Sequence, residues 1–183
     1  MSMIGNTLLN NLIKFKHIYN PAQVLDMLHE EIRLVLRQHT SNDHSGMDMG
    51  LCMLEKAPED AQVKVTFAGA KRPLFYIAKG EKTLRQLKGT KKSIGGNQRE
   101  DISFANQCVL LSKGSKLYLG TDGYIDQNNE VRKKIGTENF VAFLEEIHGE
   151  SMCIQCDLLE KKLLSHMANT EQRDDILVMG IQV

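Results

Sequence analysis

Apolar residues alternate with polar ones through the middle of this 183-residue chain, whereas apolar residues at helical spacing occupy both sides of that region. Alternation with a period of two predicts strands, and the clearest case runs from Met47 to Met53. One more strand, residues 175–183, follows the second helical block. Other strands are expected at residues 63–67, 74–78, 83–87, 103–105, 109–111 and 116–119. Because the last strand must join a sheet formed by earlier ones, the order predicts an α+β fold of mostly antiparallel strands.

Two helices are expected before the strands and two after them. Residues 3–16 carry one apolar face, and a second helix begins at Asn20, a capping residue followed by proline. We expect Thr137 and Ser151 to cap the two later helices. The side chains expected to face the core are Ile4, Leu8, Leu12, Phe15, Leu25, Leu28, Ile32, Val35, Leu36, Phe140, Val141, Leu144, Ile147, Ile154, Leu158, Leu159 and Leu163.

The composition excludes several classes of protein. Lysine and arginine number 23 and so do aspartate and glutamate, so a net charge of zero gives no reason to expect a nucleic-acid or membrane partner. No apolar run approaches the roughly 18 residues of a membrane span, and no signal peptide opens the chain. A cytoplasmic setting with reduced thiols is therefore expected. Cys153 and Cys156 have the spacing of a metal or redox pair, but no second pair completes a zinc site, so a structural role is favoured.

Two aspartates stand at the ends of predicted strands. Asp122 follows the apolar run 117–119 within the sequence GTDG, and Asp174 directly precedes the strand at 175–183. If these strands pair antiparallel, both carboxylates reach the same edge of the sheet. Paired carboxylates without nearby histidine or cysteine favour a hard ion such as Mg²⁺ or Mn²⁺, which points to metal-assisted hydrolysis. Read alone, aspartate before glycine is also common in structural turns.

Five segments resemble, in the same order, motifs of the SpoIIE-like branch of the metal-dependent protein phosphatases, the PPM superfamily. They are residues 45–51 (SGMDMGL), 67–74 (FAGAKRPL), 93–96 (SIGG), 117–124 (LYLGTDGY) and 173–178 (RDDILV). The resemblance treats residues 1–183 as a single phosphatase domain. It implies a four-layer α-β-β-α sandwich of two antiparallel sheets flanked by helices. In the family a Gly-Asp metal motif and further strands precede the helix that opens this chain, so the resemblance also implies an N-terminally truncated domain that lacks its first strands.

The resemblance implies a protein serine/threonine phosphatase that acts on phosphoserine or phosphothreonine of a signalling protein, often an anti-sigma-factor antagonist. Asp122 and Asp174 match the family's metal-binding aspartates, which hold two Mn²⁺ or Mg²⁺ ions that activate a water. Asp48, Asp126 and Asp175 are further carboxylates that could complete the ligand set. Because the Gly-Asp motif is absent, the alternative is a non-catalytic binding module, a pseudophosphatase. Missing strands would also leave sheet edges exposed, which predicts a homodimer or a poorly soluble monomer.

Overall fold

The computed structural model describes residues 2–41, 43–57, 62–96 and 102–183. The chain forms two compact units. Unit 1 comprises Met1–Leu74 and Leu87–Leu110, and unit 2 comprises Phe75–Gln86 and Leu111–Val183. In the part of the chain that is described, no helix combines the length and apolar character needed to cross a bilayer.

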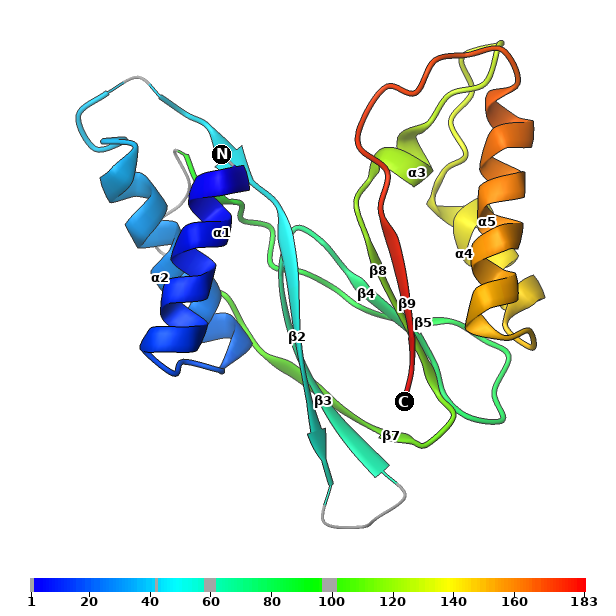
Figure 1. The fold of residues 1–183 in the computed structure, drawn as a ribbon, viewed down its shortest axis with the longest axis horizontal. Coiled ribbons are helices and arrows are strands. Elements are labelled where there is room, and N and C mark those ends of the chain that lie inside the picture. Colours follow the sequence, from blue (N-terminus) through cyan, green and yellow to red (C-terminus); the bar gives the residue numbers. More distant parts are fainter. Residues whose placement is uncertain (1, 42, 58–61, 97–101) are drawn as a thin grey trace. The chain divides into compact units, whose positions relative to one another are not determined.

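Unit 1 packs helices against antiparallel strands (Figure 1). Its elements are α1 (Ser2–Asn10), the π-helical turn η1 (Asn11–Phe15), α2 (Pro21–Val35), β1 (Gly46–Met47), β2 (Met49–Lys56), β3 (Gln62–Ala70), β6 (Ile94–Gly95) and β7 (Gln107–Ser112). One sheet has the order β2-β3-β7, and β1 pairs with β6 in a second sheet. Helix α2 contacts β3 and β6, and its side chains Leu25, Leu28 and Ile32 are fully buried in the core of this unit.

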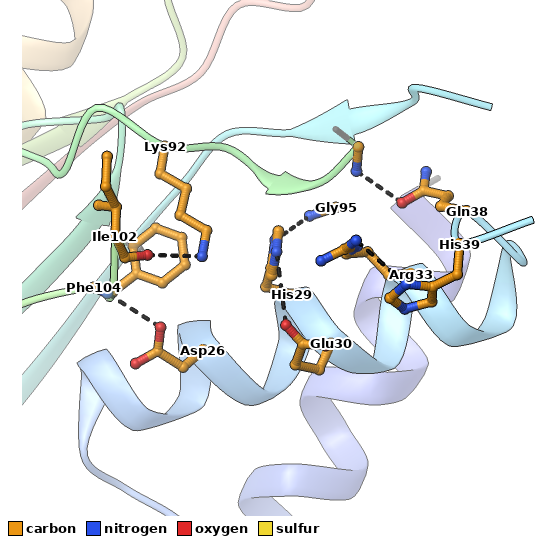
Figure 2. A network of polar contacts seen from close by, with 11 residues as sticks. Asp26, His29, Glu30, Arg33, Gln38, His39, Lys92, Gly95, Ile102 and Phe104 are labelled. Carbon is orange, nitrogen blue, oxygen red and sulfur yellow. Dashed lines mark hydrogen bonds and ion pairs between the residues drawn. The ribbon is translucent and has the colours of Figure 1, made fainter. Parts of the chain in front are cut away.

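A polar network attaches α2 to the loop around β6 (Figure 2). His29 is 1% exposed, and its Nδ1 accepts a hydrogen bond from the Gly95 amide at 3.0 Å. The Phe104 amide donates to the Asp26 carboxylate at 3.1 Å, and the Lys92 ammonium lies 5.4 Å from the centre of the Phe104 ring. Burial of the ring, followed by the charge of Lys92, lowers the pKa of His29. A neutral His29 therefore serves as the buried acceptor that holds β6 on α2.

Unit 2 consists of a four-stranded sheet and two long helices that pack beside it. Its elements are β4 (Leu74–Ile77), β5 (Arg85–Leu87), β8 (Lys116–Gly120), α3 (Gly123–Asp126), α4 (Thr137–Ile147), α5 (Met152–Met167) and β9 (Val178–Gln182). The strand order is β5-β4-β8-β9, and β8 pairs antiparallel with both of its neighbours. Figure 1 shows α5 running beside β9, and the two elements are in contact. The last strand thus joins earlier ones, as its position after two helices required.

The local signals for two helix starts are confirmed. The Asn20 side chain accepts a hydrogen bond from the Gln23 amide at 3.1 Å, and proline occupies the first helical position. The Ser151 hydroxyl accepts from the Ile154 amide at 3.3 Å. Each cap satisfies an amide that the first helical turn leaves without a partner, and this requirement depends on only a few neighbouring residues.

Other local predictions about the helices are wrong. The expected helix at 3–16 changes to π-helical hydrogen bonding at Asn11. Because bonds between residues i and i+5 widen the turn, Leu12 still faces the core whereas Phe15 is 77% exposed. Val35 and Ile154 are also exposed, one at the end of α2 and the other in the first turn of α5.

Three further predictions fail at element boundaries. Thr137 is the first residue of α4 and does not cap it, because Gly136 takes the capping position with a φ of 81°. Residues 103–105 do not form a strand, since the Phe104 amide bonds to α2 instead of to a strand. Asp48 lies between β1 and β2, so the expected strand from Met47 to Met53 is interrupted at its only carboxylate.

Candidate metal and catalytic site

The end of β8 and the start of β9 meet at one end of the sheet in unit 2. Gly120 pairs with Val178 in an antiparallel register, and the Thr121 amide extends the pairing by donating to the Leu177 carbonyl at 3.0 Å. Asp122 lies two positions after the end of β8, and Asp174 lies four positions before the start of β9. The segments that carry the two aspartates therefore lie at the same end of the sheet, as antiparallel pairing of the strands predicts.

Thr121 and Gly123, on either side of Asp122, connect its turn to the backbone beside Asp174. The Thr121 hydroxyl donates to the Asp175 carbonyl at 2.8 Å and accepts from the Leu177 amide at 3.0 Å. A Cβ atom placed on Gly123 would lie 2.4 Å from the Asp175 carbonyl oxygen. Glycine is therefore required here for close approach of two backbones, and the sequence offered only the weaker reason of a tight turn.

Asp122 occupies the residue before α3, a helix of a single turn. Its backbone has a φ of −77° and a ψ of −13°, and its carbonyl accepts from the Asp126 amide at 2.8 Å. The half-buried Asp122 side chain makes no capping hydrogen bond to α3. Asp122 therefore precedes α3 without serving as its side-chain cap.

Asp174 is exposed in the segment between α5 and β9. Its Oδ1 accepts from the Asp175 amide at 2.8 Å, and its carbonyl accepts from the Gln172 side chain at 2.7 Å. One carboxylate oxygen is thus oriented by the next residue's backbone. Asp175 contributes its amide to this bond and its carbonyl to Thr121, which gives it a structural part in the same turn.

The remaining candidate carboxylates are engaged elsewhere. Asp126 forms an ion pair with Lys134 at 3.1 Å. Asp48 belongs to unit 1, where it accepts from the Ser93 hydroxyl at 2.6 Å and lies 3.5 Å from the Arg72 guanidinium. Among the described residues, no three histidine, cysteine, aspartate or glutamate side chains gather closely enough to hold a metal ion. The role of Asp122 and Asp174 as metal ligands therefore stays a prediction.

The donor set at this sheet end fits a divalent ion in kind. Carboxylate and carbonyl oxygens are the ligands that Mg²⁺ and Mn²⁺ prefer, and Mg²⁺ is often held by only one or two carboxylates with water in its other positions. Asp122 and Asp174 supply two such carboxylates from paired segments. Soft ligands are absent from this turn, since Cys153 and Cys156 lie exposed on α5 as free thiols.

Two buried tyrosines hold the candidate site onto α5. The Tyr124 hydroxyl in α3 donates to the Leu159 carbonyl, and the Tyr118 hydroxyl in β8 donates to the Gln155 side chain, both at 2.9 Å. Burial raises the pKa of each tyrosine to about 12. Both hydroxyls therefore remain protonated donors at neutral pH, and α5 supports the elements on both sides of Asp122.

Comparison with solved structures gives the fold. The SiaA-PP2C domain of Pseudomonas aeruginosa matches with a TM-score of 0.83 at 26% sequence identity, over 100% of this chain and 68% of that one. The RsbU and RsbW domains of a Mycobacterium tuberculosis protein match with a TM-score of 0.69 at 18% identity, over 97% of this chain and 45% of that one. The Mn-presoaked phosphatase domain of the cell fate determinant SpoIIE from Bacillus subtilis matches with a TM-score of 0.55 at 13% identity, over 98% and 73%.

These matches confirm the expected fold class, a mixed structure of antiparallel sheets and helices of the PP2C type. By sequence, no curated protein matches the chain. The family model for Stage II sporulation protein E (SpoIIE) matches residues 1–183, the full length. The chain therefore belongs to the SpoIIE family, whose fold is that of PP2C-type phosphatase domains.

Proposed function

We propose that this chain is a metal-dependent protein serine/threonine phosphatase domain that uses Mn²⁺ or Mg²⁺ to hydrolyse phosphoserine or phosphothreonine on a signalling protein. Membership of the SpoIIE family and the PP2C-type fold support the reaction class. The observation that carries the proposal is the pairing of β8 with β9, which brings the Asp122 and Asp174 segments to one sheet end. An Mn-presoaked relative supports the choice of metal.

In this proposal Asp122 and Asp174 hold the metal through their carboxylates. A divalent ion, when bound, lowers the pKa of a water and offsets negative charge on the phosphoryl oxygens. The short aspartate side chain keeps the donor oxygen close to a backbone that Thr121 and Gly123 fix in place. In this proposal both aspartates act as ligands and the attacking nucleophile is a water.

The proposed substrate is a phosphorylated regulatory protein, with a small anti-sigma-factor antagonist as the first candidate. Support for this choice comes from membership of the family alone. The neutral net charge of the chain gives no independent indication of the partner's charge.

The direct test measures phosphate release from para-nitrophenyl phosphate and from a phosphoserine peptide, with Mn²⁺ or Mg²⁺ added. Asp122→Asn and Asp174→Asn should each lower the rate on the order of a hundredfold, since each removes a charged group from the reaction centre. Asp157→Asn is the matched control, because Asp157 is an exposed aspartate of α5 in the same unit. Activity that survives chelation, or equal rates for all three variants, would refute the proposal.

A further inference from the structure

Gln127 is a buried amide between the two segments that carry the aspartates. It follows α3 directly and is 1% exposed. Its Nε2 donates to the Glu171 carbonyl at 3.0 Å, and its Oε1 accepts from the Arg173 amide at 3.3 Å. The same Nε2 also donates to the Asn128 carbonyl at 3.1 Å. Donor and acceptor ends of one side chain thus connect the end of α3 to the backbone just before Asp174.

The backbone of Gln127 is itself anchored. Its carbonyl accepts from the Ile135 amide at 3.1 Å and from His166 Nε2 at 3.2 Å. His166 Nε2 also lies 3.1 Å from the Lys133 carbonyl, so with two carbonyl partners this nitrogen must carry the proton. His166 belongs to the last turn of α5, which places the bridging amide on a long helix and not on a free loop.

Asp174 is consequently bracketed by two attachments to the segment around Asp122. On one side, the Arg173 amide bonds to Gln127, five positions after Asp122. On the other side, the Asp175 carbonyl bonds to Thr121, one position before Asp122. Residues 171–175 are all exposed, so apolar packing contributes little to their placement. Hydrogen bonds from the Asp122 segment therefore set the position of the Asp174 backbone.

We propose that Gln127 is a positioning residue that fixes Asp174 relative to Asp122, a role that rests on the proposed function of the two carboxylates as ligands of a shared ion. The task requires an amide, because the side chain has to donate to a carbonyl and accept from an amide at once. A glutamate of the same size would place an acceptor against the Glu171 and Asn128 carbonyls, which repels them. A methionine would remove all three bonds without adding charge.

Gln155 provides a closely matched control. It is 2% exposed, its Oε1 accepts from the Tyr118 hydroxyl at 2.9 Å, and its Nε2 donates to the Glu150 carbonyl at 2.9 Å. It thus shares the residue type, the burial and the pattern of bonds of Gln127. It differs in where its bonds go, because they reach Tyr118 in the middle of β8 and the Glu150 carbonyl before α5, and none of them reaches residues 121–123 or 171–175. A loss of stability common to both variants can therefore be separated from a loss of positioning.

The experiment compares Gln127→Glu with Gln155→Glu by hydrogen exchange of residues 171–176 and by calorimetric titration with Mn²⁺. We expect Gln127→Glu alone to raise exchange in this segment at least tenfold and to weaken Mn²⁺ binding by about 10- to 100-fold, as loss of a supporting contact does elsewhere. Gln127→Met should give the same pattern, and it replaces the glutamate variant if that variant does not fold.

Two results would overturn the inference. In one, exchange at residues 171–176 is the same in the Gln127 and Gln155 variants. In the other, exchange rises in the Gln127 variants while their affinity for Mn²⁺ stays at the wild-type value. If the wild-type chain binds no Mn²⁺, the proposed function fails, and the exchange comparison alone decides whether Gln127 holds the segment.

Discussion

Replacing Gly123 with alanine tests whether the Asp122 turn has to touch the backbone beside Asp174. A Cβ at this position would lie 2.4 Å from the Asp175 carbonyl oxygen, whereas ordinary contact begins at 3.4 Å, so the segments must separate by about 1 Å. Overpacking of this kind costs about 1–3 kcal/mol. Each kcal/mol lowers the midpoint of thermal unfolding by about 2–4 °C in a chain of this size. Circular dichroism on heating measures that shift.

The same substitution should also weaken Mn²⁺ binding, because the displaced turn carries Asp122. Gly149→Ala is the control, since Gly149 lies in the same unit and a Cβ there would meet nothing within 4 Å. We expect the control to stay within about 0.5 kcal/mol of the wild type. The reasoning is refuted if Gly123→Ala unfolds at the temperature of the control and binds Mn²⁺ as the wild type does.

Three further predictions concern other parts of the chain. Burial lowers the pKa of His29 in the folded chain below the value of 6.5 that it has in the unfolded chain. The free energy of unfolding is therefore highest above pH 6.5, and it decreases as the pH falls from 6.5 to the pKa of the folded state. In urea unfolding, the free energy of unfolding should fall by up to about 1.4 kcal/mol between about pH 7.5 and 5.5, and His29→Gln should make this fall smaller. Equal falls in the wild type and the variant would contradict this. Tyr118→Phe leaves the buried Gln155 acceptor without its 2.9 Å hydrogen bond and should cost about 1–3 kcal/mol in urea unfolding, so an unchanged midpoint would be evidence against the bond. Among the described strands β9 has one neighbour, β8, and it carries the exposed Met179. Light scattering should therefore detect self-association, and Met179→Lys should reduce it. A wild-type chain that is monomeric at every concentration would contradict this prediction.

The sequence was informative where the physical cause is local or where chain order restricts the topology. Asn20 and Ser151 cap helices because their side chains bond to amides three residues away. The meeting of the Asp122 and Asp174 segments follows from two strands with one antiparallel register. The assignment of these aspartates as metal ligands came from their paired placement at strand ends and from the resemblance, and it stays a prediction.

The sequence was uninformative where partners distant in the chain decide the outcome. Gln127 looks like an ordinary polar residue after a turn, yet it is buried because its partners lie 44 and 46 positions later. Phe15 fits a helical stripe but is exposed because the helix changes its hydrogen-bonding period at Asn11. The bonds that Asp48 makes to Ser93 and Arg72 in unit 1 likewise depend on residues that are distant in the chain.

Titration with Mn²⁺ of Asp122→Asn, Asp174→Asn and the double variant, followed by electron paramagnetic resonance, tests the shared ion most directly. If both carboxylates bind one ion, each single change removes most of the affinity, and the double variant loses less than the sum of the two free-energy changes. An Asp174→Asn variant with wild-type affinity, or losses that add as for two independent sites, would contradict the account.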